Sequence, residues 1–225
     1  MSDEERNFVA HVRLDQVVVG PGETVVAPDA ASEVFYTLFE GWAFRYRILD
    51  KGGRQIVAVL LPGDLIGLNA SLGGHAWHGV QTLTAVRLCP VRADRFSSLF
   101  QTHPTMAEAL VHTLLLEEEL YDRRLLRLGR QRPTQRLSHF MLELRERLLA
   151  RGAAADHPLE FPLTYQQMMD ALGLSRSQLA RSLGELRERG WALLGGGRLT
   201  FTDPAAMAEF CEFDSGAGSA PRALI

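Results

Sequence analysis

The stretch FPLTYQQMMDALGLSRSQLARSLGELRERGWALLGGGRLTF, residues 161–201, decides the fold of the C-terminal part of the chain. Thr164 and Ser175 are typical N-cap residues, and each precedes a short helical pattern. Gln178 completes a capping box with Ser175, and Gly173 ends the first helix at a position that favours a left-handed backbone. Two short helices around such a turn predict a helix-turn-helix. The following WALLGGGRLTF predicts a hairpin, which makes the unit winged.

The outer side of the second predicted helix carries side chains that can contact nucleic acid. Arg can pair in a bidentate manner with guanine, Gln with adenine, and Ser can bond a phosphate or a base. An Arg-rich helix face is often only solvated, but this one starts a recognition helix followed by a wing. The candidate DNA-binding residues are Thr164, Tyr165, Gln166, Ser175, Arg176, Ser177, Gln178, Arg181 and Arg198. We expect Arg181 to read a base, and we expect backbone contacts from Thr164, Tyr165, Gln166 and Arg198.

The net charge of −3 hides a segregation of charge along the chain. Residues 1–120 contain 9 Lys and Arg against 15 Asp and Glu, whereas residues 121–200 contain 14 against 8. Residues 201–225 are acidic again, with 1 against 4. A basic block that holds the helix-turn-helix indicates binding of nucleic acid or another polyanion, although a solvated charged face explains the charge alone equally well.

Residues 17–89 form short runs rich in Val, Ile, Leu, Phe and Tyr, separated by Gly-containing turns. DKGG at residues 50–53 and PGD at residues 62–64 are predicted hairpin turns. In WAFRYRIL, apolar residues alternate with arginines. This alternation predicts a strand with Trp42, Phe44, Tyr46 and Ile48 on one face and Arg45 and Arg47 on the other. Several short strands at near-even spacing predict a small antiparallel barrel or roll.

After Pro90 the pattern takes on the period of helices. RADRFSSLFQTHP predicts a short helix, and Pro104 suits the first turn of a long helix that runs to about Gly129. The long helix has an apolar stripe of the kind that a two-stranded coiled coil needs. The stripe consists of Leu110, Leu114, Tyr121, Leu125 and Leu128. A single long helix packed on its own domain fits the stripe nearly as well.

Three acidic residues, Glu117–Glu119, interrupt this stripe. A like-charge pair buried across a dimer would be costly unless Arg123 or Arg124 matched it. GRQRP at residues 129–133 then predicts a hinge. Residues 134–151 predict an amphipathic helix whose inward side chains are Leu137, Phe140, Met141, Leu144 and Leu148. The expected domains are residues 1–102, a dimerisation helix at 103–130, and residues 131–225.

Composition excludes several classes of protein. The chain has 225 residues, of which 46% are apolar, which is typical of globular proteins with two modest domains. No apolar run approaches the roughly 18 residues of a membrane span, and the N-terminus lacks a signal-peptide stretch, so we expect a cytoplasmic protein. Cys89 and Cys211 lack CxxC spacing, and no nucleophile–base grouping, phosphate loop or paired-carboxylate pattern stands out. We therefore expect no enzymatic activity, no metal and no cofactor.

Over nearly its full length the chain resembles transcription regulators of the Crp/Fnr family. The matching segments are LFEGWAFRYRI at 38–48, LPGDLIG at 61–67, the long central helix, and LTYQQMMDALGLSRSQLARSLGELRERG at 163–190. The resemblance implies an α+β protein with an N-terminal antiparallel β-roll of the jelly-roll type, a central dimerisation helix and a C-terminal winged helix-turn-helix. It implies a homodimer whose two recognition helices enter successive major grooves of a palindromic site in double-stranded DNA. RNA polymerase is a further partner to test.

The recognition helix departs from the family pattern at two positions. Many relatives carry Glu at the position of Ser177 and Ser at that of Ala180, ahead of the Arg matched by Arg181. A Glu there would accept a hydrogen bond from cytosine. Losing the Glu while keeping Arg181 therefore predicts a related DNA site with altered bases.

The roll departs from the cyclic-nucleotide-binding relatives in residues 63–80. In those relatives a Glu just after the GDxIG motif binds the ribose hydroxyl, and the Arg of an Arg-Ser pair binds the cyclic phosphate. Here Leu68 follows Gly67, Ala76-Trp77 stands near the Arg-Ser place, and the segment holds no Arg or Lys. A buried phosphate without a cation is poorly compensated, which argues against cyclic AMP binding in the usual way. Backbone amides of Gly73 and Gly74 are the remaining source of anion contacts.

Other effectors can be weighed in the same way. An oxygen-sensing iron–sulfur cluster of the family's type needs four cysteines, and none precedes Cys89, which itself fits a buried apolar residue better than a redox switch. His75 and His78 are either haem or metal ligands or exposed loop histidines. The candidate effector pocket consists of Gly67, Leu68, His75, Trp77, His78 and Tyr121.

Three hypotheses follow from the sequence. In the first, the protein binds DNA without a small-molecule activator, because the Arg is missing and because Leu68, Leu72 and Trp77 are expected to fill the roll. In the second, the roll holds a different effector, such as haem or an apolar metabolite, and DNA binding requires it. In the third, the winged unit contacts a protein partner, and association is insensitive to salt.

Overall fold

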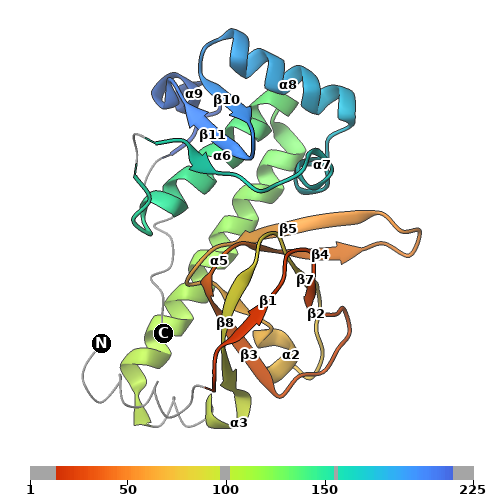
Figure 1. The fold of residues 1–225 in the computed structure, drawn as a ribbon, viewed down its shortest axis with the longest axis vertical. Helices are drawn as coiled ribbons and strands as arrows, with labels where there is room; N and C mark the ends of the chain where they lie inside the picture. The colour runs from red at the N-terminus through yellow and green to blue at the C-terminus, as the bar shows by residue number, and fades with distance from the viewer. Residues whose placement is uncertain (1–13, 97–101, 155–156, 215–225) are drawn as a thin grey trace. The chain divides into compact units, whose positions relative to one another are not determined.

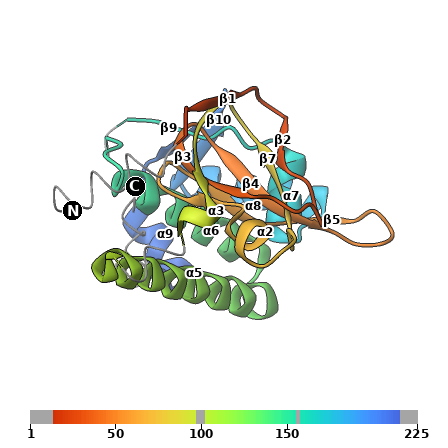
Figure 2. The same ribbon diagram turned by 90° about the horizontal axis from the view of Figure 1, so that it is seen from below.

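The structure is a computed structural model that describes residues 14–96, 102–154 and 157–214 (Figure 1). The chain divides into two compact units that meet between Leu115 and Leu116. This boundary lies inside α5 (Pro104–Arg130), a helix that Figure 2 shows as unbroken. Within the described ranges, no helix combines the length and apolar character that a membrane crossing requires.

The first unit is built from two four-stranded antiparallel sheets. One sheet has the order β1 (Val17–Val19), β8 (Val86–Arg92), β3 (Val34–Glu40) and β6 (Leu65–Ile66). The other has the order β2 (Thr24–Val26), β7 (Gly79–Thr82), β4 (Ala43–Ile48) and β5 (Arg54–Leu60). Both sheets contribute to one buried cluster, with Leu38, Ile66 and Leu88 from the first and Ala43, Leu60 and Val80 from the second. The predicted β-roll is confirmed.

The two predicted hairpin turns have different outcomes. Residues 50–53 join the antiparallel strands β4 and β5, with Gly52 at φ 86° and its N–H donating to the carbonyl of Leu49 over 2.7 Å. Residues 62–64 also turn, and Gly63 has φ 96°. However, β5 and β6 belong to different sheets, so the second hairpin prediction was wrong. The buried carboxylate of Asp64 stabilises this inter-sheet turn by accepting a hydrogen bond from the Leu61 amide over 2.8 Å.

The predicted faces of β4 hold only for its first half. Trp42 and Phe44 are buried as expected, but Arg45 is only 7% exposed and Ile48 is exposed. The pairing of β4 with β5 shifts between Arg45 and Tyr46. The extra residue of this β-bulge is Val57 on β5, and β4 itself keeps a regular register with β7, so the bulge does not reverse the faces of β4. Ala43, Phe44 and Arg45 are consecutive and all buried, so both faces of β4 are covered there, which a period-2 pattern does not predict.

Among the described residues, the helices of the first unit are α2 (Leu68–Leu72), α3 (Ala93–Phe96) and the first half of α5. The predicted helix at RADRFSSLFQTHP is therefore confirmed over α3, while residues 97–101 lie outside the described ranges. The predicted long helix is confirmed as α5. One member of its predicted stripe was wrong: Leu110 is buried within the chain, as are Met106 and Ala107. The exposed large apolar side chains on α5 are Val111, Leu114, Leu115, Tyr121, Leu125, Leu126 and Leu128, and those with the spacing of a coiled-coil seam form an exposed apolar row of Val111, Leu114, Tyr121, Leu125 and Leu128.

The second unit contains a helix-turn-helix with a wing. Its elements are α6 (Pro133–Leu149), β9 (Leu159–Glu160), α7 (Tyr165–Leu172), α8 (Arg176–Glu188), β10 (Ala192–Gly195), β11 (Arg198–Phe201) and α9 (Pro204–Phe210). β11 pairs antiparallel with both β10 and β9, and α6 packs against α7, α8 and α9. Because α6 is covered on several sides, it buries polar residues that the predicted one-sided helix did not include. These are Thr134, Ser138, His139, Glu143 and Arg147.

Candidate nucleic-acid interface

The two helices of the helix-turn-helix begin with matching capping boxes. The Thr164 hydroxyl accepts from the Gln167 amide, and the Gln167 side-chain oxygen accepts from the Thr164 amide over 2.8 Å. Ser175 and Gln178 repeat the arrangement, with 2.9 Å from the Ser175 amide to the Gln178 side-chain oxygen. Gly173 ends α7 with φ 61°. Both predicted caps and the left-handed Gly173 are confirmed, and the Thr164–Gln167 box, though present in the sequence as T-x-x-Q, was missed.

These caps fix which residues α8 presents to solvent. Leu179 and Leu186 point into the unit and are buried. Arg176, Ser177, Ala180 and Arg181 are exposed on the N-terminal half of the helix. Within the described part of the chain, neither Arg176 nor Arg181 forms an ion pair. Two extended cations on an otherwise small-residue surface leave room for the edge of a base or a phosphate to approach.

Two other predicted contact residues have polar atoms that already serve the fold. The side-chain oxygen of Gln178 is used by the capping box, which leaves its NH₂ group as the donor for any further contact. The hydroxyl groups of Ser177 and Ser175 are 3.1 Å apart. Base reading on this helix would therefore depend chiefly on Arg176 and Arg181.

The remaining predicted DNA contacts lie at the start of α7 and in the wing. Tyr165 is 62% exposed, and Gln166 is exposed while donating to the carboxylate of Asp170 over 2.7 Å. Arg198 is exposed at the first position of β11, and its guanidinium lies 3.4 Å from the carbonyl oxygen of Pro158. Gly196 and Gly197, with φ of 58° and 70°, form the turn that brings Arg198 to the end of the wing.

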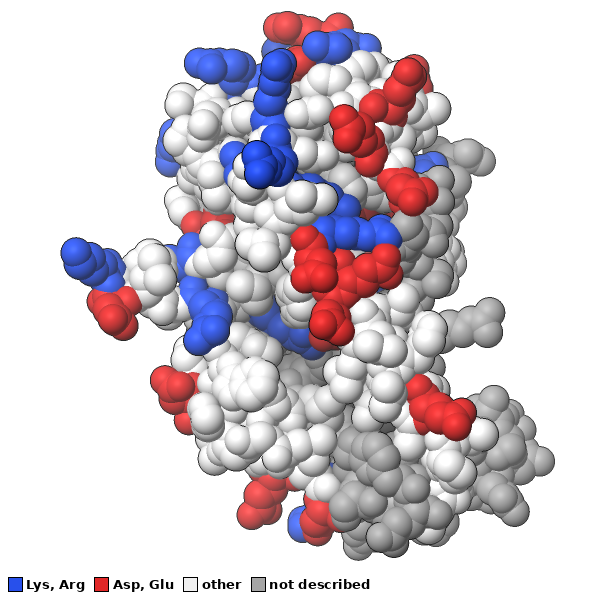
Figure 3. Space-filling model, turned by 180° about the vertical axis from the view of Figure 1, so that it is seen from behind, with Lys and Arg blue, Asp and Glu red and all other residues white. Residues whose placement is uncertain are grey.

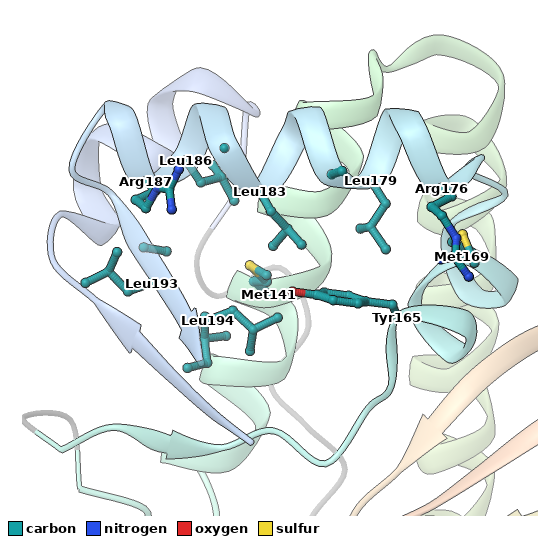
Figure 4. Close-up of a pocket in the computed structure, with 14 residues that line it drawn as sticks. Met141, Tyr165, Met169, Arg176, Leu179, Leu183, Leu186, Arg187, Leu193 and Leu194 are labelled. Carbon is teal, nitrogen blue, oxygen red and sulfur yellow. The ribbon is translucent and has the colours of Figure 1, made fainter. Parts of the chain in front are cut away.

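A hollow of about 470 Å³ opens between α8, the wing and the start of α7. Figure 4 shows the Tyr165 ring pointing across it toward Met141, with Arg176 at one end and Arg187 at the other. Its remaining labelled lining is apolar: Met169, Leu179, Leu183, Leu186, Leu193 and Leu194. The lining therefore comes from α8, both strands of the wing, α7 and α6.

Charges of both signs are present on this unit. Figure 3 shows Lys and Arg beside Asp and Glu over the unit that carries α8. The segment 121–200 contains 14 basic and 8 acidic residues, but Glu117–Glu119 and the acidic residues after 200 belong to the same unit. The exposed arginines of α8 itself are the feature that favours a polyanionic partner.

The residues predicted for an effector pocket belong to both compact units. Gly67, with φ 80°, precedes the short helix α2, and Leu68 at its start is half-buried. His75 is exposed and His78 is half-buried. Tyr121 belongs to the other compact unit, where its ring lies beneath the guanidinium of Arg124. Within the described ranges, no group of three or more His, Cys, Asp or Glu side chains is placed to hold a metal ion.

The expected apolar filling of the roll was partly wrong. Leu72 is 52% exposed and Trp77 is 59% exposed, so neither fills the interior. Ala76 is fully buried instead, and its backbone forms hydrogen bonds with Asp29 and Ala30 over 2.9 and 2.8 Å. This backbone pairing directs the side chain of Ala76 inward and leaves that of the next residue, Trp77, on the surface.

Sequence reasoning also missed a cation beside this segment. Arg45 on β4 is the register partner of Val80 on β7 and is buried where both faces of β4 are covered. Its guanidinium donates to the carbonyl of Leu65 over 2.6 Å. A positive charge therefore lies next to residues 63–80 although the segment itself contains none, and at least one of its donors is engaged within the protein.

Comparisons with known proteins give the same two-part division. Residues 16–103 match the family described as cyclic nucleotide-binding domain, and residues 135–210 match the Crp-like helix-turn-helix domain. The nitrogen fixation regulation protein FixK of Bradyrhizobium diazoefficiens is 30% identical over 184 residues, which cover 82% of this chain and 76% of the relative. The fumarate and nitrate reduction regulatory protein of Escherichia coli is 24% identical, with 88% and 80% covered.

The solved structures agree on the fold. A FixK structure from Bradyrhizobium japonicum superposes with a TM-score of 0.77 at 22% identity, over 87% of this chain and 96% of that one. The fold, the two matched domains and the similarity to FixK lead to one assignment. The chain belongs to the Crp/Fnr family of DNA-binding transcription regulators.

Proposed function

We propose that this protein binds a palindromic site in double-stranded DNA as a homodimer, in the cytoplasm and without enzymatic activity, and thereby regulates transcription. The observation that carries the proposal is the exposed N-terminal face of α8, where Arg176 and Arg181 project from a helix held by capping at its start and by Leu179 and Leu186 beneath. A rigid, cationic helix face is what direct reading of a major groove requires.

We assign separate roles to the predicted contact residues. Arg181 and Arg176 read bases, while Thr164, Tyr165, Gln166, Ser175 and Arg198 position the protein on the DNA backbone. Ser177 is too short to reproduce the acceptor that Glu supplies in many relatives, so the half-site differs at the base pair that such a Glu would read. Gln178 contributes through its NH₂ group.

The exposed row on α5 is proposed to form the dimer interface. Val111, Leu114, Tyr121, Leu125 and Leu128 are spaced alternately three and four residues apart, with Glu118 at the gap between Leu114 and Tyr121. This spacing is that of a coiled-coil seam, and a second copy of the same helix is its simplest complement. The functional division that we propose is a roll at 1–102, a dimerisation helix at 103–130 and a DNA-binding domain at 131–225.

We further propose that DNA binding does not depend on cyclic AMP. The segment 63–80 has no cation of its own, and Arg45 beside it already donates to the Leu65 carbonyl. The core between the sheets is occupied by the chain's own side chains, including Ala76 and Val80. An anionic nucleotide would therefore meet no cation from this segment, and the one beside it is already bonded within the protein.

A second candidate is an effector-dependent regulator, and one atom favours it. Asn69 on α2 has a buried side-chain nitrogen with no hydrogen-bond acceptor among the described residues. A buried donor without an acceptor is costly, and a small ligand that accepts a hydrogen bond would remove that cost. Asn69 directly follows Leu68, within the segment where relatives hold their nucleotide.

Selection of genomic DNA fragments by the purified, ligand-stripped protein tests both candidates. At physiological salt, we expect one sharp palindromic motif. Diffuse binding that disappears as salt rises would contradict effector-independent recognition and support the second candidate. Salt-insensitive association with protein but not with DNA would contradict both.

A thermal-shift measurement with 1 mM cyclic AMP, about 1,000 times the Kd of a micromolar site, separates the effector question from the DNA question. Under the proposal, the melting temperature stays the same. A site with such affinity would add about 4 kcal/mol to the free energy of unfolding and raise the melting temperature by several degrees.

A further inference from the structure

The second unit contains a buried charge cluster that no DNA contact uses. Glu143 lies in the middle of α6 with its side chain 8% exposed. One carboxylate oxygen is bonded by the guanidinium of Arg124, and the other lies 3.6 Å from that of Arg127. Burial alone disfavours the charged carboxyl, but Arg124, Arg147 and Arg127 together outweigh it and hold the pKa of Glu143 below its ordinary value. Glu143 is thus a carboxylate fixed between cations.

The cluster crosses the break between two helices. Arg124 and Arg127 belong to the last two turns of α5, which ends at Arg130, and α6 begins at Pro133. Only two residues connect the helices, and Arg132 has an extended backbone with φ −68° and ψ 157°. With so short a connection, the angle between the two helices depends on a few backbone dihedral angles. Side-chain contacts between the helices can fix that angle further.

Further contacts extend from this cluster to the recognition helix. Thr134, at the start of α6, donates to the carboxylate of Glu185 on α8 over 2.8 Å. Leu128 on α5 lies against the turn of the helix-turn-helix, because a Cβ placed on Gly173 would be 3.7 Å from its Cδ2. The last turns of α5, with the exposed Tyr121, Leu125 and Leu128, and α8 are therefore parts of one compact unit.

We propose that Glu143 is a positioning residue for DNA recognition: through Arg124 and Arg127 it fixes the direction of α8 relative to the apolar row of α5, and it thereby sets the spacing between the two half-sites. The inference rests on the proposed dimeric DNA binding. In a two-fold symmetric dimer, the separation of the recognition helices follows from the angle between each helix and the shared seam. One base pair changes that separation by only about 3.4 Å, so a small change of angle matters.

A role in stability alone would explain the cluster less well. Buried ion pairs are often no more stabilising than apolar side chains of similar volume, since each charge must leave water. Their bonds are directional, however, and the one carboxylate here joins two cations of the neighbouring helix. A fixed orientation of α8 is what recognition of two half-sites at one spacing requires.

The test is selection of DNA sites in which two identical half-sites are separated by spacers of different length. We expect the wild-type protein to enrich one spacing. Glu143→Gln should keep the same half-site sequence, but it should enrich neighbouring spacings as well and bind the wild-type spacing about tenfold more weakly or worse. Glu119→Gln is the matched control, because Glu119 belongs to an exposed ion pair with Arg123 on α5, and it should leave the spacing unchanged.

The variant Arg124→Met/Arg127→Met/Glu143→Leu guards against a simple loss of folding. It removes the carboxylate together with the two arginines of α5 at similar volume, so neither Arg124 nor Arg127 is left without its partner, while Arg147 of α6 remains. Melting and circular dichroism establish that it folds, and we expect it to relax the spacing as Glu143→Gln does. A folded variant with the wild-type spacing and affinity would overturn the inference, and so would failure of both variants to fold, since the cluster would then be a stability element.

The outcome for the wild-type protein separates the two proposals. If the wild type selects no half-site, the proposed DNA function fails before any variant is compared. If it selects half-sites with a single spacing and both folded variants do the same, the function stands and the positioning role of Glu143 fails.

Discussion

The hydroxyl of Thr134 donates a hydrogen bond to Oε2 of Glu185 over 2.8 Å, joining the start of α6 to the recognition helix α8. The Ser182 hydroxyl lies 3.1 Å from the same Thr134 oxygen, and Glu185 also forms an ion pair with Arg189. Thr134 and Ser182 are buried. A bond to a carboxylate is stronger than one between neutral groups, so this contact fixes the base of α8.

Replacing Thr134 by Val should therefore destabilise the second unit. The variant keeps the shape of the side chain but removes the donor, and we expect the free energy of unfolding to fall by about 1–2 kcal/mol in urea titrations. Thr202→Val, at an exposed position whose hydroxyl is not part of this network, is the control and should change the stability little. Equal stability of the two variants would show that the Thr134–Glu185 bond contributes nothing.

Arg181→Ala tests base reading by the recognition helix. If Arg181 forms a bidentate pair with a base, its loss should cost about 1–3 kcal/mol of specific binding per subunit and relax the preference at one position of the half-site. Binding to the selected palindrome and to single-base variants of it measures both effects. Lys51→Ala, in the β4–β5 turn of the other unit, is the control. An Arg181→Ala protein with unchanged affinity and preference would remove Arg181 from the reading residues.

Arg198→Ala tests a different kind of contact. A wing residue that neutralises a phosphate strengthens binding to all sequences alike. We expect the variant to bind specific and unrelated DNA more weakly by similar factors. The slope of log K against log salt should become shallower by about 0.9 for each phosphate that is no longer neutralised. A change in sequence preference with an unchanged slope would instead mean that Arg198 reads a base.

Local signals in the sequence predicted the helix-turn-helix well. The hydrogen bonds that cap these helices join residues at most four positions apart, at Thr164, Gly173 and Ser175. The local sequence pattern is therefore enough to predict the structure at these positions. The proposed reading residues Arg176 and Arg181 could likewise be named, because α8 is regular and its inward leucines fix the outer face. Gln178 shows the limit of such predictions. Its side-chain oxygen accepts a hydrogen bond from the Ser175 amide in the capping box, so this oxygen is not available to a base.

Contacts between distant residues could not be predicted in this way. Arg124 and Glu143 are 19 residues apart on two different helices, and neither helical pattern distinguishes them from solvated charges. The burial of Arg45 depends on the cover of both faces of β4, and the outward turn of Trp77 depends on pairing between Ala76 and Ala30. Each of these features arises from tertiary packing that periodicity does not encode.

Glu118 is expected to weaken the proposed dimer. It occupies the gap in the exposed row of α5, and the arginines that could have matched it are engaged elsewhere, Arg123 with Glu119 and Arg124 with Glu143. Glu118→Leu should tighten dimerisation by at least about tenfold, because burying an apolar side chain of this size is worth about 1.5–3 kcal/mol. Glu118→Gln should give a smaller gain by removing only the repulsion.

Sedimentation equilibrium measures both dissociation constants. Glu108→Leu, on the same helix but outside the row, is the control and should leave the dimer unchanged. Tightening by Glu108→Leu to the same extent would indicate nonspecific association. A weaker dimer in Glu118→Leu would place Glu118 in a favourable ion pair across the interface instead.

His139 should make the stability of the protein depend on pH near neutrality. Its ring is 4% exposed and packs on Phe213 at 4.5 Å between ring centroids. Burial, followed by the charge of Arg127, lowers the pKa of His139 from 6.5 to about 3. The folded protein thus keeps His139 neutral while the unfolded chain takes up a proton below about pH 6.5.

The pH effect has a definite sign. Because the unfolded state binds more protons, stability is complete above about pH 6.5 and falls as the pH decreases, by up to about 1.4 kcal/mol per pH unit. Glu143 acts in a lower range, because its lowered pKa places its contribution below the usual carboxyl value of about 4.5. In urea titrations between pH 5 and pH 7, Glu146 contributes with the opposite sign, because burial raises its pKa, so His139 is identified by comparing variants. His139→Gln should flatten the profile in this window, whereas His157→Gln, at an exposed position, should leave the slope intact. An unchanged slope in His139→Gln would mean that the proton is taken up elsewhere.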